Sequence, residues 1–257
     1  MELTSIVLLA GVGLAGGIIT AIVGGSSLII FPAMLAAGLP PILANSSSTV
    51  AMTPSTLAAA YADRESIPGW DRSFLGMLLV AFFGSIVGAL LLLYTPNDAF
   101  TALVPLLVGG ATALFAFANH VKRWASRYTS RWARDGDGSA ALRLILFAPI
   151  AVYGGYFGAA MGVMLLAILS IGHAGDFRQI NAIKNILGTF VGLVAATIFV
   201  WRGAVSWPEA ITVMIAALAG GYIGGRLVRV MPTTLFRAIV IVVGVGLSLI
   251  YAWRYWQ

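Results

Sequence analysis

Two sets of polar residues with identical spacing lie in two different apolar segments of the chain. They are Asn45, Ser48, Thr49 and Thr53 in the first segment, and Asn181, Lys184, Asn185 and Thr189 in the second. Both sets step by three, one and four residues, so each predicts one face of an α-helix. Amide, hydroxyl and ammonium groups all donate hydrogen bonds, and an ammonium adds the charge that an oxyanion needs. The two polar stripes therefore indicate a site for a small anion.

The composition decides where such a site lies. Of the 257 residues, 60 % are hydrophobic and 9 % are charged, and the mean hydropathy is +0.97. A soluble domain averages about 25 % charged residues. Because no soluble fold buries so much apolar surface, the sequence predicts an all-α polytopic membrane protein whose surroundings are the lipid bilayer. The apolar runs are continuous rather than alternating, which disfavours a transmembrane barrel.

Apolar runs and helix breakers predict two sets of five helical segments. The segments are 3–23, 27–38, 43–62, 72–94 and 98–118, and then 142–161, 163–173, 179–201, 207–229 and 233–255. The segments 27–38 and 163–173 are short against a hydrocarbon core of about 30 Å, since a helix rises about 1.5 Å per residue. We expect them to be incomplete or distorted crossings, or re-entrant segments packed inside protein.

The two sets of segments match each other at an offset of 136 to 138 residues. Gly16-Gly17 matches Gly154-Gly155, Asn45 matches Asn181, and Gly84 matches Gly221. The match predicts a first transmembrane repeat over 1–118, a basic loop over 119–141 and a second repeat over 142–257. Five crossings in each half would invert the second repeat relative to the first, whereas four would not.

Positive charge favours the inverted arrangement, because cytoplasmic loops are enriched in Lys and Arg. With five crossings per half and the N-terminus outside, only Arg202 and Arg254 fall in outside connections. The inside connections then hold Arg64, Arg72, Lys122, Arg123, Arg127, Arg131, Arg134, Arg143, Arg178, Arg226, Arg229 and Arg237. Four crossings per half would place the last three outside. We therefore expect a multi-pass protein of the cytoplasmic membrane with both termini outside and the 119–141 loop in the cytoplasm.

The stripes have a structural alternative, because Asn, Ser and Thr often only join membrane helices by hydrogen bonds worth about 0.6 kcal/mol each. Their number at matching places favours substrate binding, by Asn45, Ser46, Ser48, Thr49, Asn181, Lys184 and Asn185. Both stripes also follow helix breakers, Pro40-Pro41 and Gly172 to Asp176, and a helix N-terminus suits an anion. A lysine inside a membrane helix needs water, a partner or a ligand. The alternative for Lys184 is that its stem reaches the interface.

Glycine-rich breaks separate the first and second helices of each half. Gly24, Gly25, Ser26 and Gly162 are the predicted hinge or helix-break positions, and Ser26 or Ser27 would suit the N-cap of the following short helix. The alternative for these glycines is close helix packing.

Residue types that catalysis, cofactors or metals need are sparse and scattered. His120 and His173 stand alone, there is no cysteine, and the nine acids fall at or near segment ends. No nucleotide-binding loop, nucleophile elbow or H-E-x-x-H motif is present. A large share of the net charge of +6 lies in one loop, and it does not indicate nucleic acid as a partner. We expect no enzyme activity, no cofactor and no metal.

At these breaks and stripes the sequence resembles the TauE/SafE family, also called the sulfite exporter family. The resemblance lies in the glycine-rich break of 16–27, Pro32, the turn Gly38-Leu39-Pro40-Pro41 and the helix start 44–49. The second half repeats it from Gly154-Gly155 to Gly162 and over 180–185, with Ser170 where the first half has Pro32. The resemblance implies transport of sulfite, sulfonates and related sulfur-containing anions across the cytoplasmic membrane.

Together these features predict a secondary transporter of a small anion, most simply a sulfonate or sulfite. Hydrogen bonds would come from the polar stripes, and Lys184 would supply the compensating charge. A membrane-embedded enzyme and a non-transporting assembly subunit are the alternatives, and a homodimer is an alternative to a monomer. The substrate, the direction of transport and any coupling ion stay open.

Overall fold

The structure is a computed structural model that describes residues 3–22, 25–62, 72–118, 120, 136–169, 177–227 and 233–256. These residues form ten α-helices and no strand. The first half holds α1 (Leu3–Ile22), α2 (Ser27–Ala36), α3 (Pro41–Ala62), α4 (Arg72–Tyr94) and α5 (Asn97–Ala116). The second holds α7 (Gly136–Tyr156), α8 (Met161–Leu169), α9 (Phe177–Trp201), α10 (Trp207–Leu227) and α11 (Thr233–Trp256).

The all-α class and the ten predicted segments are confirmed. The largest difference is at the start of α7, which begins at Gly136 rather than near 142. The sequence Gly136-Asp137-Gly138-Ser139 has the composition of a loop, yet an acid near a helix start is favourable because it faces the positive end of the helix dipole. Among the described residues, four helices are long and apolar enough to cross a membrane, with spans Leu3–Thr20, Arg72–Tyr94, Asn97–Ala116 and Gln179–Trp201.

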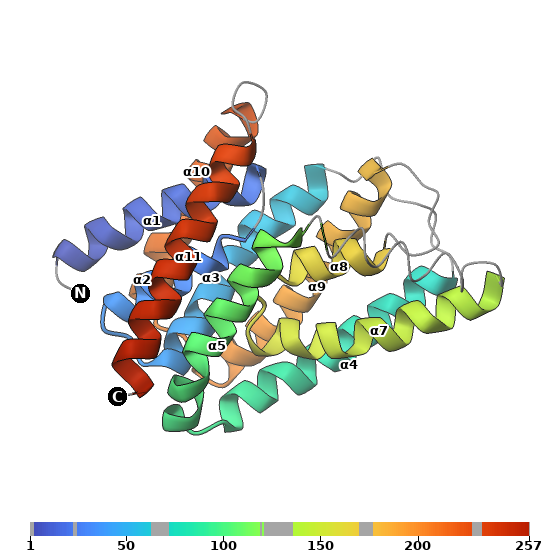
Figure 1. Cartoon of the computed structure of the whole chain (residues 1–257), viewed down its shortest axis with the longest axis horizontal. Coiled ribbons are helices and arrows are strands. Elements are labelled where there is room, and N and C mark those ends of the chain that lie inside the picture. Colours follow the sequence, from blue (N-terminus) through green and yellow to red (C-terminus); the bar gives the residue numbers. More distant parts are fainter. Residues whose placement is uncertain are drawn as a thin grey trace.

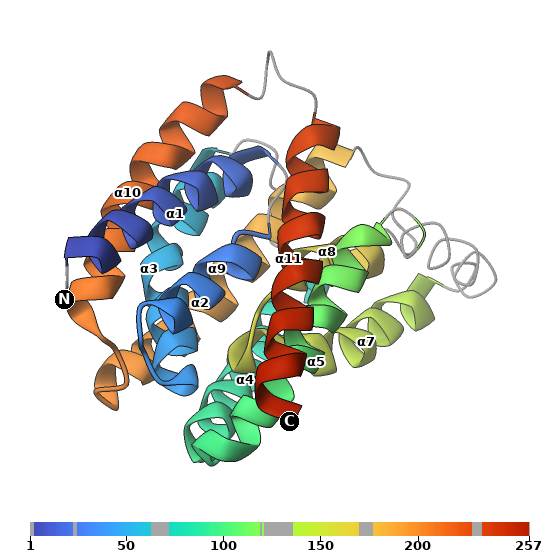
Figure 2. The same cartoon turned by 60° about the vertical axis from the view of Figure 1, so that its left-hand side comes forward.

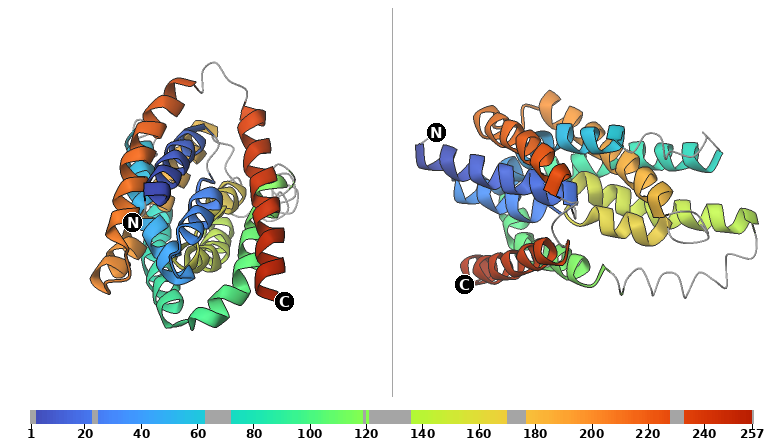
Figure 3. Two further views of the ribbon diagram at one scale, coloured as in Figure 1. Left: turned by 90° about the vertical axis from the view of Figure 1, so that its left-hand side faces the viewer. Right: turned by 90° about the horizontal axis from the view of Figure 1, so that it is seen from above.

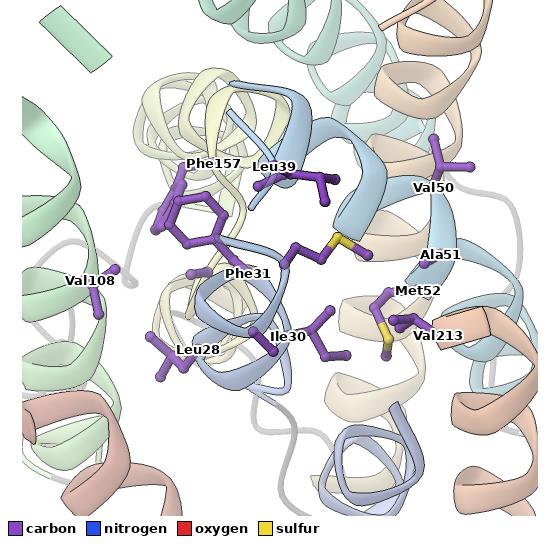
Figure 4. Packing of buried hydrophobic residues seen from close by; sticks show 14 of the residues in the cluster. Leu28, Ile30, Phe31, Leu39, Val50, Ala51, Met52, Val108, Phe157 and Val213 are labelled. Atoms are coloured by element: carbon purple, nitrogen blue, oxygen red, sulfur yellow. The ribbon is translucent and has the colours of Figure 1, made fainter. Parts of the chain in front are cut away.

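The two short helices lie inside the bundle. The ten residues of α2 and the nine of α8 rise about 14 to 15 Å, half of a hydrocarbon core. Phe31 of α2 packs edge-on against Phe157, with ring centroids 5.2 Å apart, in the largest apolar cluster (Figure 4). Seen end-on, the longer helices surround α2 and α8 (Figure 3). Burial in protein makes these short helices compatible with a membrane interior.

The longer helices pack in pairs that each take one helix from either half of the chain. The pairs are α1 with α10, α4 with α7, α3 with α9, and α5 with α11 (Figures 1 and 2). Glycine makes two of these contacts close. A Cβ on Gly17 would meet the Ala217 carbonyl of α10, and one on Gly88 would meet the Val152 carbonyl of α7. Only a residue without a side chain lets these backbones approach so closely.

The two chain ends lie at the same end of the molecule (Figures 1 and 3). The helices α4 and α7 begin at the opposite end. We call the first end the terminal end and the second the α7-start end. Most of the predicted loop 119–141 lies outside the described residues, as does the predicted break residue Gly24.

Candidate functional site

The helices that carry the two polar stripes, α3 and α9, cross in antiparallel directions. The Thr189 hydroxyl of α9 donates a hydrogen bond of 2.9 Å to the Thr56 carbonyl of α3. Further along, a Cβ on Gly192 would lie 3.7 Å from Thr53 Oγ1. Residue numbers therefore rise on α9 as they fall on α3. Thr53 and Thr189, the last members of the two stripes, both lie at this crossing.

The asparagine ends of the stripes are not brought together. Asn45 lies near the start of α3, and its neighbour Ser46 donates a hydrogen bond to the Ala204 carbonyl, just past the end of α9. Asn181 lies at the other end of α9, about 30 Å along the helix from Trp201. Each stripe therefore runs from the crossing toward a different end of the bundle, so Asn45 and Asn181 do not face one central cavity in this conformation.

The start of α3 is joined by hydrogen bonds to two breaks in the second half. Asn45 Nδ2 donates to the carbonyl of Tyr156, the last residue of α7, at 2.8 Å. The backbone N–H of Ser206 donates to Ser47 Oγ at 2.9 Å. Asn45, Ser46 and Ser47 are all but completely buried. The first stripe thus connects the end of α7 with the 203–206 turn between α9 and α10.

Three hydroxyls near the start of α3 donate to backbone carbonyls. Ser48 and Thr49 donate to the Asn45 carbonyl at 2.8 and 3.0 Å, and Ser46 shares its hydrogen among three carbonyls. A hydroxyl has only one hydrogen to donate. In this conformation Ser46 joins α3 to the 203–206 turn, which was its structural alternative, while Ser48 and Thr49 donate to a carbonyl of their own helix.

The second stripe is more open. Asn181, Lys184 and Asn185 are half-buried and all make contacts within the protein. The Lys184 stem lies against the first turn of α8, because a Cβ on Gly162 would be 3.7 Å from Lys184 Cδ. One turn later, Gly188 faces Met161, with 3.5 Å between an added Cβ and Met161 Cε. The start of α8 therefore lies on α9 between Lys184 and Gly188, where the helix dipole and the ammonium add to each other.

The breaks before α2 and α8 both contain left-handed residues. Gly25 has φ +86°, and Ser26 occupies the N-cap position of α2 but makes no capping hydrogen bond. Its hydroxyl oxygen accepts one of 2.7 Å from Thr20 instead. In the second break the left-handed residues are Gly158 at φ +73° and Ala160 at +59°. Gly162 lies within α8, so the turn precedes this predicted break residue.

Sequence reasoning missed Arg143 as an interior residue, because it was placed in a connection near the start of a segment. It is only 8 % exposed and lies two turns into α7. Its spacing was the available signal: Arg143, Phe147 and Ala151 recur every fourth residue on one buried face. The Ser206-x-x-Glu209 sequence was a second missed signal, and the Ser206 hydroxyl donates to the Glu209 carboxylate at the start of α10.

Two other features of the described residues lie apart from the stripes. An apolar hollow of about 380 Å³ lies between α4 and α7, and it is lined by Leu79, Val80, Phe83, Gly84, Ala148, Pro149 and Val152. Its lining offers nothing to an anion. No group of three or more His, Cys, Asp or Glu residues is placed to hold a metal ion in the described part of the chain.

In the described residues ten helices, two of them short and enclosed, include four that are long and apolar enough to cross a membrane, which defines the class of a polytopic α-helical membrane protein. The chain belongs to the sulfite exporter TauE/SafE family, whose sequence profile matches residues 9–251. It is 25 % identical over 239 residues to a "Probable membrane transporter protein" of Haemophilus influenzae, covering 90 % of this chain and 88 % of the relative.

Two further relatives carry similar descriptions. "Probable membrane transporter protein ORF9" of Sinorhizobium sp is 25 % identical, over 91 % of this chain and 87 % of the relative. "Probable membrane transporter protein YfcA" of Escherichia coli K12 is 25 % identical, over 92 % and 86 %. No solved structure matches the chain. The protein is a membrane transporter of the TauE/SafE family, which confirms the resemblance drawn from its breaks and stripes.

Proposed function

We propose that the protein is a secondary transporter of a small sulfur-containing oxyanion, a sulfonate or sulfite, in the cytoplasmic membrane. The observation that carries the proposal is the position of Lys184 against Gly162 at the start of α8. Asn181 lies one turn before Lys184 and Asn185 directly after it, so two amides accompany the ammonium. Together they offer a charge, amide donors and a helix N-terminus to three sulfonate oxygens.

The first stripe takes a different role in this proposal. In the conformation described, Ser46, Ser48 and Thr49 donate to carbonyls, and the start of α3 is joined to the 203–206 turn. We assign Asn45 and these hydroxyls to substrate binding only in an alternative conformation, in which α3 has separated from that turn and the Ser48 and Thr49 hydroxyls have rotated from the Asn45 carbonyl toward the anion. Access would then alternate between the two ends of the bundle, as in transporters with broken helices.

The proposal includes two inverted repeats, 1–118 and 142–257, joined by the 119–141 loop. If each helix is replaced by its counterpart in the other half, the α1–α10 pair becomes the α7–α4 pair. The α3–α9 and α5–α11 pairs each become themselves. The structure contains all four pairs, as two related repeats would require. The contacts at the crossing support the same symmetry. Thr53 faces Gly192 and Thr56 faces Thr189, and an offset of 136 residues converts one pair into the other.

The proposed orientation places the termini outside and the α7-start end in the cytoplasm. The shared location of the two chain ends supports it, and so does the predicted excess of Lys and Arg at the opposite end (Figure 1). Cytoplasmic-membrane localisation and a homodimer stay predictions.

Flux into proteoliposomes made from the pure protein tests the function. Labelled sulfite, sulfate, taurine and isethionate are compared, with empty liposomes and the Lys184→Ala variant as controls. We expect saturable flux of at least one sulfur oxyanion that depends on Lys184. A well-folded wild type that moves none of them would overturn the proposal and favour an enzyme or an assembly subunit.

A further inference from the structure

The second half of the chain holds a second cation in its interior, besides Lys184. Arg143 on α7 is 8 % exposed, although a guanidinium is among the groups that are most costly to bury. Charged residues inside membrane helices are rare, and they commonly mark ion or substrate paths. Arg143 is thus a candidate for substrate binding, and not only a positive charge that sets the orientation of the protein in the membrane.

Arg143 lies at one end of the apolar cluster that supports Lys184. Phe147, one turn further along α7, is 1 % exposed and belongs to this cluster together with Ile183 and Leu187 of α9. Ile183 directly precedes Lys184, and both α7 and α9 pack on α8. Arg143 and Lys184 therefore belong to one three-helix unit, with Arg143 near the start of α7 and Lys184 near the start of α9.

The matching positions of the first half are neutral. The offset of the glycine pairs, Gly16-Gly17 and Gly154-Gly155, places Ser5 opposite Arg143. The offset of the stripes places Ser48 opposite Lys184. Arg143 and Lys184 thus both correspond to serines in the first half. In two repeats of opposite direction, this difference places Arg143 and Lys184 toward one end of the transport path, with serines at the matching positions toward the other.

We propose that Arg143 is a second anion-binding residue, located between the α7-start end and the Lys184 site. The inference rests on the proposed function. A buried guanidinium binds an oxyanion through paired N–H groups, and it raises the local concentration of anions in a cleft of low dielectric constant. Arg143 already makes a contact within the protein, and the arriving anion joins or replaces that contact. The transporter therefore binds its substrate more tightly from the α7-start end than from the terminal end.

The test measures KM for sulfite or taurine from each side, with the protein reconstituted in one orientation. For the wild type we expect a KM several-fold lower from the α7-start side. Arg143→Gln should raise that KM about tenfold and leave the KM from the other side within twofold, because a lost charge contact weakens binding on its own side. Arg143→Lys keeps the charge and should restore most of the loss.

Arg202→Gln is the matched control. It removes one guanidinium from the terminal end, where Arg202 is exposed and donates to the Tyr94 hydroxyl at 2.8 Å. It should leave both KM values unchanged.

Equal KM values from the two sides of the wild type would overturn the inference, and that measurement needs no variant to fold. An unchanged KM in Arg143→Gln, with flux still dependent on Lys184, would overturn it and leave the proposed function intact. If Arg143→Lys and Arg143→Gln both lower the yield of folded protein and neither changes KM, Arg143 has a structural role and the inference is overturned. Absence of any flux in the wild type would instead remove the proposed function.

Discussion

Thr189 of α9 donates a hydrogen bond to the Thr56 carbonyl of α3, at the point where the two stripe-bearing helices cross. Thr189 is 4 % exposed, so this bond forms in the interior of the bundle. It joins the two halves of the chain at a distance of 133 residues in sequence. The last member of the second stripe thus joins two helices, which is the structural alternative for such residues.

Thr189→Val should destabilise the folded protein. The change keeps the shape of the side chain and removes the donor, so the Thr56 carbonyl loses a partner, at a cost of about 0.5 to 2 kcal/mol. Thermal unfolding in detergent measures the effect. The control is Thr197→Val on the same helix, where the exposed hydroxyl donates only to the Leu193 carbonyl of its own α9. Equal unfolding temperatures for the two variants would contradict this role of Thr189.

Lys184→Ala should weaken anion binding a hundredfold or more, and Lys184→Arg should be only partly tolerated. An anion that leaves water needs a compensating charge, and the α8 N-terminus supplies only about half of one. Arginine keeps the charge but needs more room beside Gly162. Uptake and protein level are measured together. Wild-type flux from a well-expressed Lys184→Ala variant would mean that the lysine stem only reaches the interface.

Gly17→Ala should lower the yield and stability of the folded protein, since the new Cβ meets the Ala217 carbonyl of α10. Overpacking of this kind costs about 1 to 3 kcal/mol. Gly11→Ala on the same helix is the control, because nothing lies within 4 Å of its added Cβ. Thermal unfolding in detergent compares the two variants. Equal loss in both would show that helix propensity or lipid contact, and not the α1–α10 contact, decides the result.

Cysteine labelling tests the orientation, and the native chain has no cysteine to interfere. Asn97→Cys, at the exposed start of α5, should react with an impermeant thiol reagent in intact cells. Ser130→Cys, in the predicted cytoplasmic loop and outside the described residues, should react only after the cells are opened. Labelling of Ser130→Cys in intact cells would reverse the proposed orientation.

The helices were predictable from the sequence to within a few residues, apart from the start of α7. Apolar runs and helix breakers such as Pro40-Pro41 indicate where a membrane helix begins and ends. The partners of polar side chains were not predictable. Spacing places Asn45 on one face of a helix, but it does not identify the Tyr156 carbonyl that receives the amide hydrogen of Asn45. The sequence also does not indicate whether an arginine near a segment end is buried. Arg143 of α7 is buried.

The antiparallel crossing of α3 and α9 has a mechanical consequence. A rigid rod that tilts about a central pivot moves its two ends in opposite directions. If α3 tilts about the Thr56–Thr189 contact, its start moves away from the 203–206 turn while its far end swings the other way. Opening the bundle at the start of α3 would then close it at the far end of α3. One contact at the crossing would thus couple the two ends of the bundle to each other.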